Sequence, residues 1–224
     1  MTPEQIAHLI KSATNLVFLT GAGVSVPSGI PDYRSIDGLY QKAPEYLLSR
    51  RALLTDTKDF HDFVKHIYHP EATPNLIHTK MAELGGTVIT QNIDGLHKKA
   101  GSRDVIEFHG DLYTCYCEKC RQHVPYQDFL QSYEHAECGG TVRPNVVLYD
   151  EGIDYGNIFR AEQALLKADT IVIVGTTFQV YPFASLLDYA NPRAQILAIN
   201  KDPLHVPNLT AQHIGDATDI FKLL

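Results

Sequence analysis

The sequence has no long apolar run, no excess of basic residues and no cysteine outside one short segment. No hydrophobic stretch approaches the roughly 20 residues that a membrane-spanning helix needs. The first 20 residues, MTPEQIAHLIKSATNLVFLT, place an acidic residue before the apolar part and contain no small-residue cleavage site. We therefore expect neither a secretory signal peptide nor a membrane partner.

The charge balance is acidic, with 19 lysines and arginines against 26 aspartates and glutamates and a formal net charge of −7. This balance disfavours non-specific binding to nucleic acid, which requires a basic surface. The 224 residues, 44% hydrophobic and 20% charged, have an ordinary globular composition. They predict one large domain, or one domain with a small insert.

All four cysteines lie between Cys115 and Cys138. A disulfide framework would distribute its cysteines along the chain, so this clustering favours a metal site. It also favours a reducing compartment, and we expect the protein in the cytoplasm.

No internal repeat, low-complexity tract or flexible linker interrupts the chain. Thr2 and Pro3 are typical of a helix start, and the helix is expected to reach about Ser12. Six apolar runs each end in glycine or polar residues, as strands do, namely NLVFLTGAG, TVITQNID, DVIEFHG, NVVLYDE, DTIVIVGTT and AQILAINKD. Helical patterns separate several of them, namely PNLIHTKMAELG, YGNIFRAEQALLKA and PFASLLDYA. The alternation predicts an α/β fold, a Rossmann-like parallel sheet with helices on both faces.

Two segments break the alternation: residues 36–72, which are mostly helical in pattern, and residues 113–142, which hold all four cysteines. We expect them to form a smaller helical and zinc-knuckle domain. Residues 1–35, 73–112 and 143–224 then form the Rossmann-like domain. Ligands of such sheets bind beyond the carboxyl ends of the strands, where this chain concentrates its glycines and polar residues.

The first candidate segment is GAGVSVPSGIPDYRS, residues 21–35. Gly21 and Gly23 follow a strand, so their backbone N–H groups are candidates to face a pyrophosphate. Val26 occupies the place of the third glycine of a dinucleotide-binding fingerprint. A tight turn after a strand explains this segment nearly as well.

The second and third candidate segments are TQNIDGLH and EFHG. The first places Gln91, Asn92 and Asp94 at a strand end, although a capped helix would use similar residues. The second places His109 at another strand end, where a histidine can titrate near neutral pH and act as a general base. A lone histidine is more often structural.

Taken together, the motifs of this chain resemble those of the sirtuins, which are NAD-dependent protein-lysine deacylases. The motifs that carry the resemblance are GAGVS, GIPDYRS, TQNIDGLHKKAG, the Cys-x-x-Cys pair, GGTVRPNVV, GT and INKD. The resemblance runs from about residue 14 to the carboxyl terminus and is of the small bacterial type. It implies that acyl groups pass from lysine to ADP-ribose while nicotinamide is released. An alternative with the same first step is a sirtuin-type ADP-ribosyltransferase or NAD hydrolase.

The resemblance also implies the site residues. His109 is expected to be the general base, with Asn92 as the second catalytic residue. The expected NAD-binding residues are Gly21, Ala22, Ser25, Ile30, Asp32, Tyr33, Arg34, Gln91, Asn92, Ile93, Asp94, His109, Gly175, Thr176, Asn200, Lys201 and Ala217. The acyl-lysine peptide is expected to contact Val146, Val147 and Tyr149.

For the metal, the resemblance aligns Cys117 and Cys120 with the first pair of zinc ligands and Cys138 with the end of the second. Three residues before Cys138 stands His135, in place of a cysteine. Cys₃His is a known structural zinc set, so we expect one structural zinc ion. Cys115 and His123 are rival ligands, and a site that has lost its metal is the remaining alternative.

Several positions depart from the family pattern, among them Tyr33 for phenylalanine, Asp150 for glycine, and Phe183 for a small residue. The carboxylate of Asp150 either favours basic peptides or faces solvent. Phe183 is expected to reshape the acyl channel. The helical insert lacks the Tyr-x-x-Arg pair of family members that select acidic acyl groups, which favours apolar acyl groups here.

Overall fold

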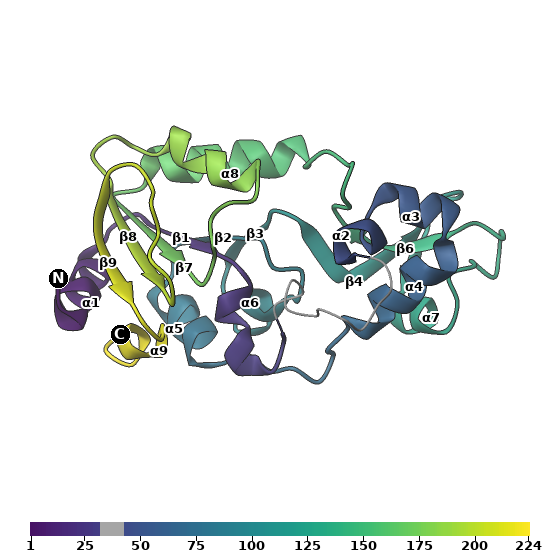
Figure 1. Ribbon diagram of the computed structural model, residues 1–224, viewed down its shortest axis with the longest axis horizontal. Helices are drawn as coiled ribbons and strands as arrows, with labels where there is room; N and C mark the ends of the chain where they lie inside the picture. Colours follow the sequence, from purple (N-terminus) through teal and green to yellow (C-terminus); the bar gives the residue numbers. More distant parts are fainter. Residues whose placement is uncertain (32–42) are drawn as a thin grey trace.

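The computed structural model describes residues 1–31 and 43–224. Its larger sheet has six parallel strands (Figure 1) in the order β3 (Asp104–Glu107), β2 (Thr87–Thr90), β1 (Leu16–Thr20), β7 (Thr170–Val174), β8 (Gln195–Asn200) and β9 (Leu209–Ile214). The predicted Rossmann-like parallel sheet is confirmed. The edge strand β9 was not predicted, because its sequence, LTAQHI, is only partly apolar and partly exposed.

Both faces of this sheet are buried, and the side chains of β1 show why. Leu16 and Phe18 pack with α1 (Pro3–Ser12), α5 (Leu76–Leu84) and α9 (Thr218–Phe221). Val17 and Leu19 pack on the opposite face with α8 (Tyr155–Lys167) and the 3₁₀ helix η4 (Phe183–Tyr189). Successive side chains of a strand point to opposite faces, so a strand between two helical layers is apolar throughout.

The helix predicted from Thr2 and Pro3 is present with the expected limits. The Thr2 side chain accepts from the Gln5 backbone N–H at 3.3 Å, and the Gln5 side chain accepts from the Thr2 N–H at 2.9 Å. This reciprocal cap satisfies two donors that the first helical turn leaves open. The predicted helices in PNLIHTKMAELG and YGNIFRAEQALLKA are also present, whereas PFASLLDYA forms a 3₁₀ helix.

The strand order places a crevice next to β1. From β1 the chain moves outward through β2 and β3 on one side, and later through β7, β8 and β9 on the other. The connections from β1 to β2 and from β7 to β8 therefore run in opposite directions along the sheet, and ligands of open parallel sheets bind at such a point. The loop after β1 contains two short 3₁₀ helices, η1 (Ala22–Val24) and η2 (Val26–Ser28). A short helix, α6 (Leu96–Lys99), follows β2.

A second, antiparallel sheet stands beside the first, in the order β5 (His123–Pro125), β4 (Gly110–Cys117) and β6 (Val142–Val146). Four helices surround it at the right of Figure 1, namely α2 (Pro44–Leu47), α3 (Arg50–Thr55), α4 (Thr57–His66) and α7 (Tyr126–Gln131). They share a core of their own with the sheet. Among the described residues of 36–72, the predicted helical character is confirmed.

The prediction that NVVLYDE continues the parallel sheet is wrong. Its first residues belong to β6, which pairs antiparallel with β4 in the second sheet. An apolar run identifies a buried strand but not the sheet that buries it. The two-domain division stays a prediction, and the second sheet extends beyond its expected limits at residues 110–112 and 143–146. Over residues 1–31 and 43–224, no helix has the length and apolarity needed to cross a membrane.

Candidate active site

A cleft of about 560 Å³ opens between the two sheets. One wall comes from the carboxyl ends of β1, β2 and β3 in the parallel sheet, and the other from the end of β6 and the turn after it. The cleft brings together residues predicted from four separate segments, namely Ala22, Ser25, Ile30, Gln91, Asn92, Ile93, Asp94, His109, Val146, Val147 and Tyr149. The predicted residues Asp32, Tyr33 and Arg34 lie outside the described residues.

The glycine loop after β1 packs directly against the loop after β7. A Cβ atom on Gly23 would lie 2.7 Å from the Gly175 Cα, so only glycine fits. Gly175 itself has φ of +61°, which glycine adopts without strain. The Gly21 N–H donates to the Val174 carbonyl at 3.3 Å, and the Gly23 N–H donates to the Gly175 carbonyl at 2.8 Å. These two N–H groups therefore do not face a pyrophosphate, and that expectation is corrected: the glycines permit close approach of two loops.

Three polar side chains form a connected network in the cleft. The Ser25 hydroxyl donates to Asp94 Oδ2 at 2.6 Å and accepts from Asn92 Nδ2 at 3.0 Å. Asn92 Nδ2 also donates to the Gly21 carbonyl at 3.1 Å, and Asp94 Oδ1 accepts from the Leu96 N–H at 2.9 Å. Each carboxylate oxygen has a second lone pair, so Asp94 can still accept from a ligand.

Two buried histidines lie behind this network, and the sequence reasoning missed both. His78 Nε2 is 3.4 Å from Ser25 Oγ, and its ring contacts the ring of His97 edge to face. His97 Nε2 is 3.1 Å from Thr20 Oγ1. Burial lowers the pKa of His78 to about 4 and that of His97 to about 3, so both are neutral at physiological pH. The sequence signal that could have indicated His78 is its position on the apolar face of the helical segment PNLIHTKMAELG.

His109 lies at the end of β3 with one ring nitrogen engaged. Its Nδ1 is 3.2 Å from the Gln91 carbonyl oxygen, which can only accept a hydrogen bond. The proton of the neutral ring is therefore on Nδ1, and Nε2 has a lone pair. Burial lowers the pKa of His109, and the hydrogen bond to Gln91 offsets this only in part. The ring is thus in the form of a general base at neutral pH.

Phe183 does not line the cleft. Its fully buried ring packs edge to face on Phe108, with a ring-centroid distance of 5.4 Å, and lies 6.3 Å from the ring of His109. The expected effect of this residue on an acyl channel is therefore at most indirect. It supports the wall that holds His109.

The remaining predicted NAD residues lie along the ends of β7, β8 and β9, outside the cleft lining. The Thr176 hydroxyl donates to Gln91 Oε1 at 2.7 Å, which joins this group to the cleft. Asn200 Nδ2 donates to the Thr176 carbonyl at 3.1 Å. Lys201 follows Asn200 and is exposed, and Ala217 is the N-cap residue of α9. All of these positions are on the same edge of the parallel sheet.

The four predicted metal ligands lie together. One donor atom from each of Cys117, Cys120, His135 and Cys138 lies within 4.8 Å of every other. Cys117 Sγ is 3.5 Å from Cys138 Sγ, and His135 Nδ1 is 3.3 Å from Cys120 Sγ and 3.2 Å from Cys138 Sγ. A tetrahedral zinc ion separates such donors by about 3.5 to 3.8 Å, so the set fits one structural zinc ion.

The surroundings of the cluster support a closed thiolate site. Burial opposes ionisation of Cys117, but backbone N–H groups and the neighbouring thiols lower its pKa to about 7. A Cβ atom on Gly140 would lie 2.6 Å from Cys117 Sγ, so a larger residue would displace a ligand. The rival Cys115 is instead buried in the second core beside Tyr68, and burial raises its pKa to about 11. The rival His123 is exposed and outside the cluster.

Comparison with known proteins gives the same picture. Residues 21–182 match the model of the Sir2 family. The NAD-dependent protein deacetylase of Listeria innocua is 53% identical over 225 residues, covering 97% of this chain and 98% of that protein. The NAD-dependent protein deacetylase of Enterococcus faecalis is 52% identical over 210 residues, covering 91% of this chain and 89% of that protein.

Solved structures of other proteins superpose on nearly the whole of this chain. A Sir2 homolog–NAD complex superposes with a TM-score of 0.89 at 32% identity, covering 98% of this chain and 91% of that chain. A complex of Sir2 with a p53 peptide and NAD⁺ has a TM-score of 0.88 at 29% identity, covering 99% of this chain and 96% of that chain. The family match, the fold and the assembled cleft lead to one conclusion: this chain belongs to the Sir2 family.

Proposed function

We propose that this chain is an NAD-dependent protein-lysine deacylase, which transfers the acyl group of an acyl-lysine to ADP-ribose and releases nicotinamide. The observation that carries the proposal is the state of His109 at the floor of the cleft. Its Nδ1 is committed to the Gln91 carbonyl, so the unprotonated Nε2 is the available base. The relatives at 52% and 53% identity are NAD-dependent protein deacetylases.

NAD supplies an electrophilic ribose carbon with nicotinamide as the leaving group. The residues of the cleft fit this ligand, because the carboxamide NH₂ of nicotinamide needs a hydrogen-bond acceptor. Asp94 can accept from the carboxamide NH₂, while Ser25 and the Leu96 N–H hold its carboxylate in place. Asn92 is oriented by Gly21 and Ser25 toward the ribose side. Ala22, Ile30 and Ile93 enclose the nicotinamide and exclude water from it.

The rest of the dinucleotide is assigned to the edge of β7, β8 and β9. Gln91 and Thr176 share a hydrogen bond and face the nicotinamide ribose, with Gly21 and Gly175 beside them. Asn200, Lys201 and Ala217 are then placed for the adenosine half. Asp32, Tyr33 and Arg34 keep their expected roles at the nicotinamide and the phosphates as proposals.

In this reaction, His109 Nε2 accepts a proton from a ribose hydroxyl, so that the ribose oxygen can attack the activated acyl group. The base must be neutral for this step, and its lowered pKa keeps it neutral at pH 7. The acyl-lysine peptide lies along Val146, Val147 and Tyr149 on the opposite wall. The Val147 N–H donates to the His109 carbonyl at 2.9 Å, which ties this wall to the base.

The proposed acyl group is apolar, either acetyl or longer. Among the described residues, the cleft lining contains no lysine or arginine to pair with an acidic acyl group. Competition between acetyl-, butyryl- and succinyl-lysine peptides of one sequence tests this. A succinyl peptide as the best substrate refutes it.

The zinc ion is proposed to be structural. Cys117, Cys120, His135 and Cys138 would fill all four positions of a tetrahedral ion and leave none for a substrate. The reduced thiols that such a site needs favour the cytoplasm as the compartment. Cell fractionation tests the location.

The first experiment incubates the purified protein with NAD and an acetyl-lysine peptide and follows all products by mass spectrometry. We expect loss of the acetyl mass and formation of O-acetyl-ADP-ribose only when NAD is present. Nicotinamide release with an intact acetyl-peptide would contradict the proposal. A protein that gains ADP-ribose would then indicate a transferase, and free ADP-ribose a hydrolase.

A further inference from the structure

The turn at residues 148–151 forms part of the cleft wall on the substrate side. The Glu151 N–H donates to the Leu148 carbonyl at 3.0 Å and closes the turn. Asp150, at the third position of the turn, has φ of +73°, a left-handed conformation that non-glycine residues seldom adopt. A turn of this kind persists only where its surroundings hold it.

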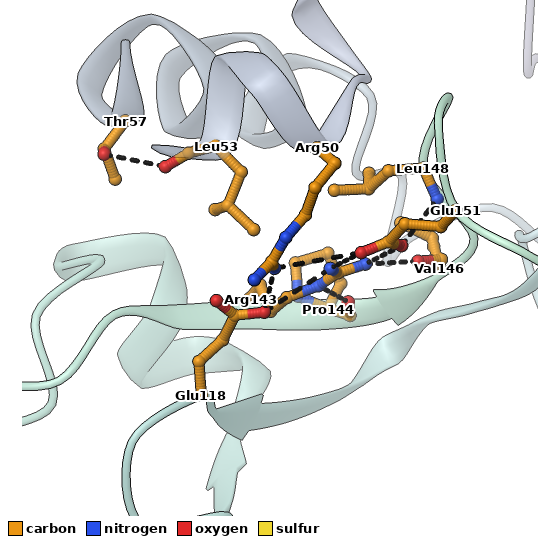
Figure 2. A network of polar contacts seen from close by, with 9 residues as sticks. All are labelled: Arg50, Leu53, Thr57, Glu118, Arg143, Pro144, Val146, Leu148 and Glu151. Carbon is orange, nitrogen blue, oxygen red and sulfur yellow. Dashed lines mark hydrogen bonds and ion pairs between the residues drawn. The ribbon is translucent and has the colours of Figure 1, made fainter. Parts of the chain in front are cut away.

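The residue that holds it is Arg143, on β6, whose contacts Figure 2 shows. Its side chain is only 2% exposed. Arg143 Nη1 is 2.6 Å from Glu151 Oε1, and Nη2 is 2.9 Å from Oε2. Nη2 also donates to the Val146 carbonyl at 2.5 Å, and Nε donates to the Pro144 carbonyl at 3.2 Å. One buried guanidinium therefore holds both the strand that leads into the turn, at Pro144 and Val146, and the Glu151 side chain at the end of the turn.

Glu151 completes the arrangement from the other side. Its Oε2 also accepts from the Leu148 N–H at 3.0 Å, so the carboxylate spans the turn. Burial opposes its ionisation, but the hydrogen bonds from Arg143 and Leu148 outweigh burial and lower its pKa. The pair is therefore ionised and bidentate, the geometry in which arginine and carboxylate interact most strongly.

A second layer joins this pair to the helices and to the cysteine knuckle. Arg50, on α3, is paired with Glu118, between Cys117 and Cys120, and lies 3.8 Å from Glu151 Oε1. Glu118 is also 3.6 Å from Arg143. The Arg50 N–H donates to the Tyr149 carbonyl at 2.9 Å, so the same residue holds the turn by its backbone.

We propose that Arg143 and Glu151 are positioning residues for the acyl-lysine substrate, because they fix the wall along which the peptide binds. This proposal rests on the proposed deacylase function. Among the described residues, no hydrogen bond or ion pair connects Arg143 to the network of Ser25, Asn92 and Asp94. Disturbing the pair therefore weakens peptide binding and leaves NAD binding intact.

The test uses Glu151→Gln, which preserves the shape of the side chain, and Arg143→Lys, which preserves the charge but not the bidentate fork. Affinity for a fluorescent acetyl-lysine peptide and for NAD is measured separately, together with KM and kcat. We expect each variant to bind the peptide about tenfold more weakly and NAD within about twofold of wild type. We expect the double variant to bind the peptide little more weakly than either single variant, because each single variant already breaks the contact between Arg143 and Glu151.

The matched control is Arg160→Gln, which removes the 2.9 Å ion pair between Arg160 on α8 and Asp104 on β3, where both side chains are about half exposed. It is expected to bind both ligands as wild type does.

If the buried variants fail to fold, Arg50→Gln tests the same turn from its partly exposed side and is expected to weaken peptide binding about threefold. Equal weakening of NAD and peptide binding, or unchanged peptide affinity in a folded variant, overturns the proposal. Absence of deacylation in the wild type would instead refute the proposed function.

Discussion

At the scale of single residues, His109 carries the chemistry because two features act together. The Gln91 carbonyl fixes the proton on Nδ1, and burial lowers the pKa of the ring. The position at a strand end was predictable from the sequence. The tautomer was not, because it depends on a carbonyl group 18 residues away in the chain.

We predict that His109→Ala lowers the deacylation rate by at least about 100-fold while the fold and NAD binding are retained. Single-turnover product formation, together with NAD binding by calorimetry, checks this. The wild-type rate should fall at acidic pH as the ring becomes protonated. Because the pKa is lowered, this fall should come below the ordinary histidine value of about 6.5. A fully active variant contradicts the assignment.

Asp150 is the second residue for which we make a prediction, which concerns the preference for particular peptide sequences. It is exposed, it lines the cleft, and it holds the left-handed conformation that the family's glycine would adopt freely. Asp150→Asn removes the charge but keeps a side chain that tolerates this conformation. We expect it to reduce the preference for peptides with a lysine or arginine beside the acyl-lysine by about two- to fivefold.

Peptides with neutral flanks should be used equally well by both proteins, and 0.5 M salt should reduce the wild-type preference in the same way. Measurement of kcat/KM on a matched pair of peptides gives the answer. An unchanged preference would mean that the carboxylate faces solvent and takes no part in recognition.

At the scale of elements, the cysteine knuckle and β6 are one unit. The knuckle joins β4 to the remainder of the second sheet, and its Glu118 contacts the pair that holds the substrate turn. The ligand spacing was readable from the sequence. The choice of His135 over Cys115 and His123 needed the structure, because only the folded chain brings His135 to the other thiols.

We predict that the purified protein contains one zinc ion per chain and that a strong chelator unfolds the second sheet first. Cys138→Ser should lose the zinc and several kcal/mol of stability, because metal binding contributes directly to the folding of small modules. His135→Cys should retain the metal, since four cysteines also form a structural site. Metal content by elemental mass spectrometry and thermal unfolding measure both effects.

The control is Cys115→Ala, which alters a buried cysteine of the second core outside the cluster. It should retain one zinc ion per chain. Loss of zinc from this variant, or its retention by Cys138→Ser, would contradict the assigned ligand set.

At the scale of the whole molecule, the buried histidines set the response to acid. His78 and His97 have pKa values of about 4 and 3 in the folded state, against 6.5 when unfolded. Below pH 6.5 the unfolded chain therefore binds protons that the folded chain does not, and stability falls with pH. Between pH 7 and pH 5 each histidine should cost about 2 kcal/mol.

Urea unfolding at pH 7, 6 and 5 checks this prediction. His97→Asn should show a weaker pH dependence than the wild type, whereas His8→Asn, on the exposed face of α1, should match it. Equal free energies of unfolding at pH 7 and pH 5 in the wild type would contradict the prediction.

The sequence by itself determined the features that arise from neighbouring residues: the capped first helix, the buried strands, the cysteine spacing and the motifs of the Sir2 family. Local geometry and side-chain periodicity dictate these, so they can be read without a fold. Only the tertiary structure decided that β6 joins the antiparallel sheet, that Gly23 serves close packing against Gly175, and that Arg143 holds the turn at Glu151. These depend on contacts between distant segments, and a single sequence carries no pattern that specifies the partner.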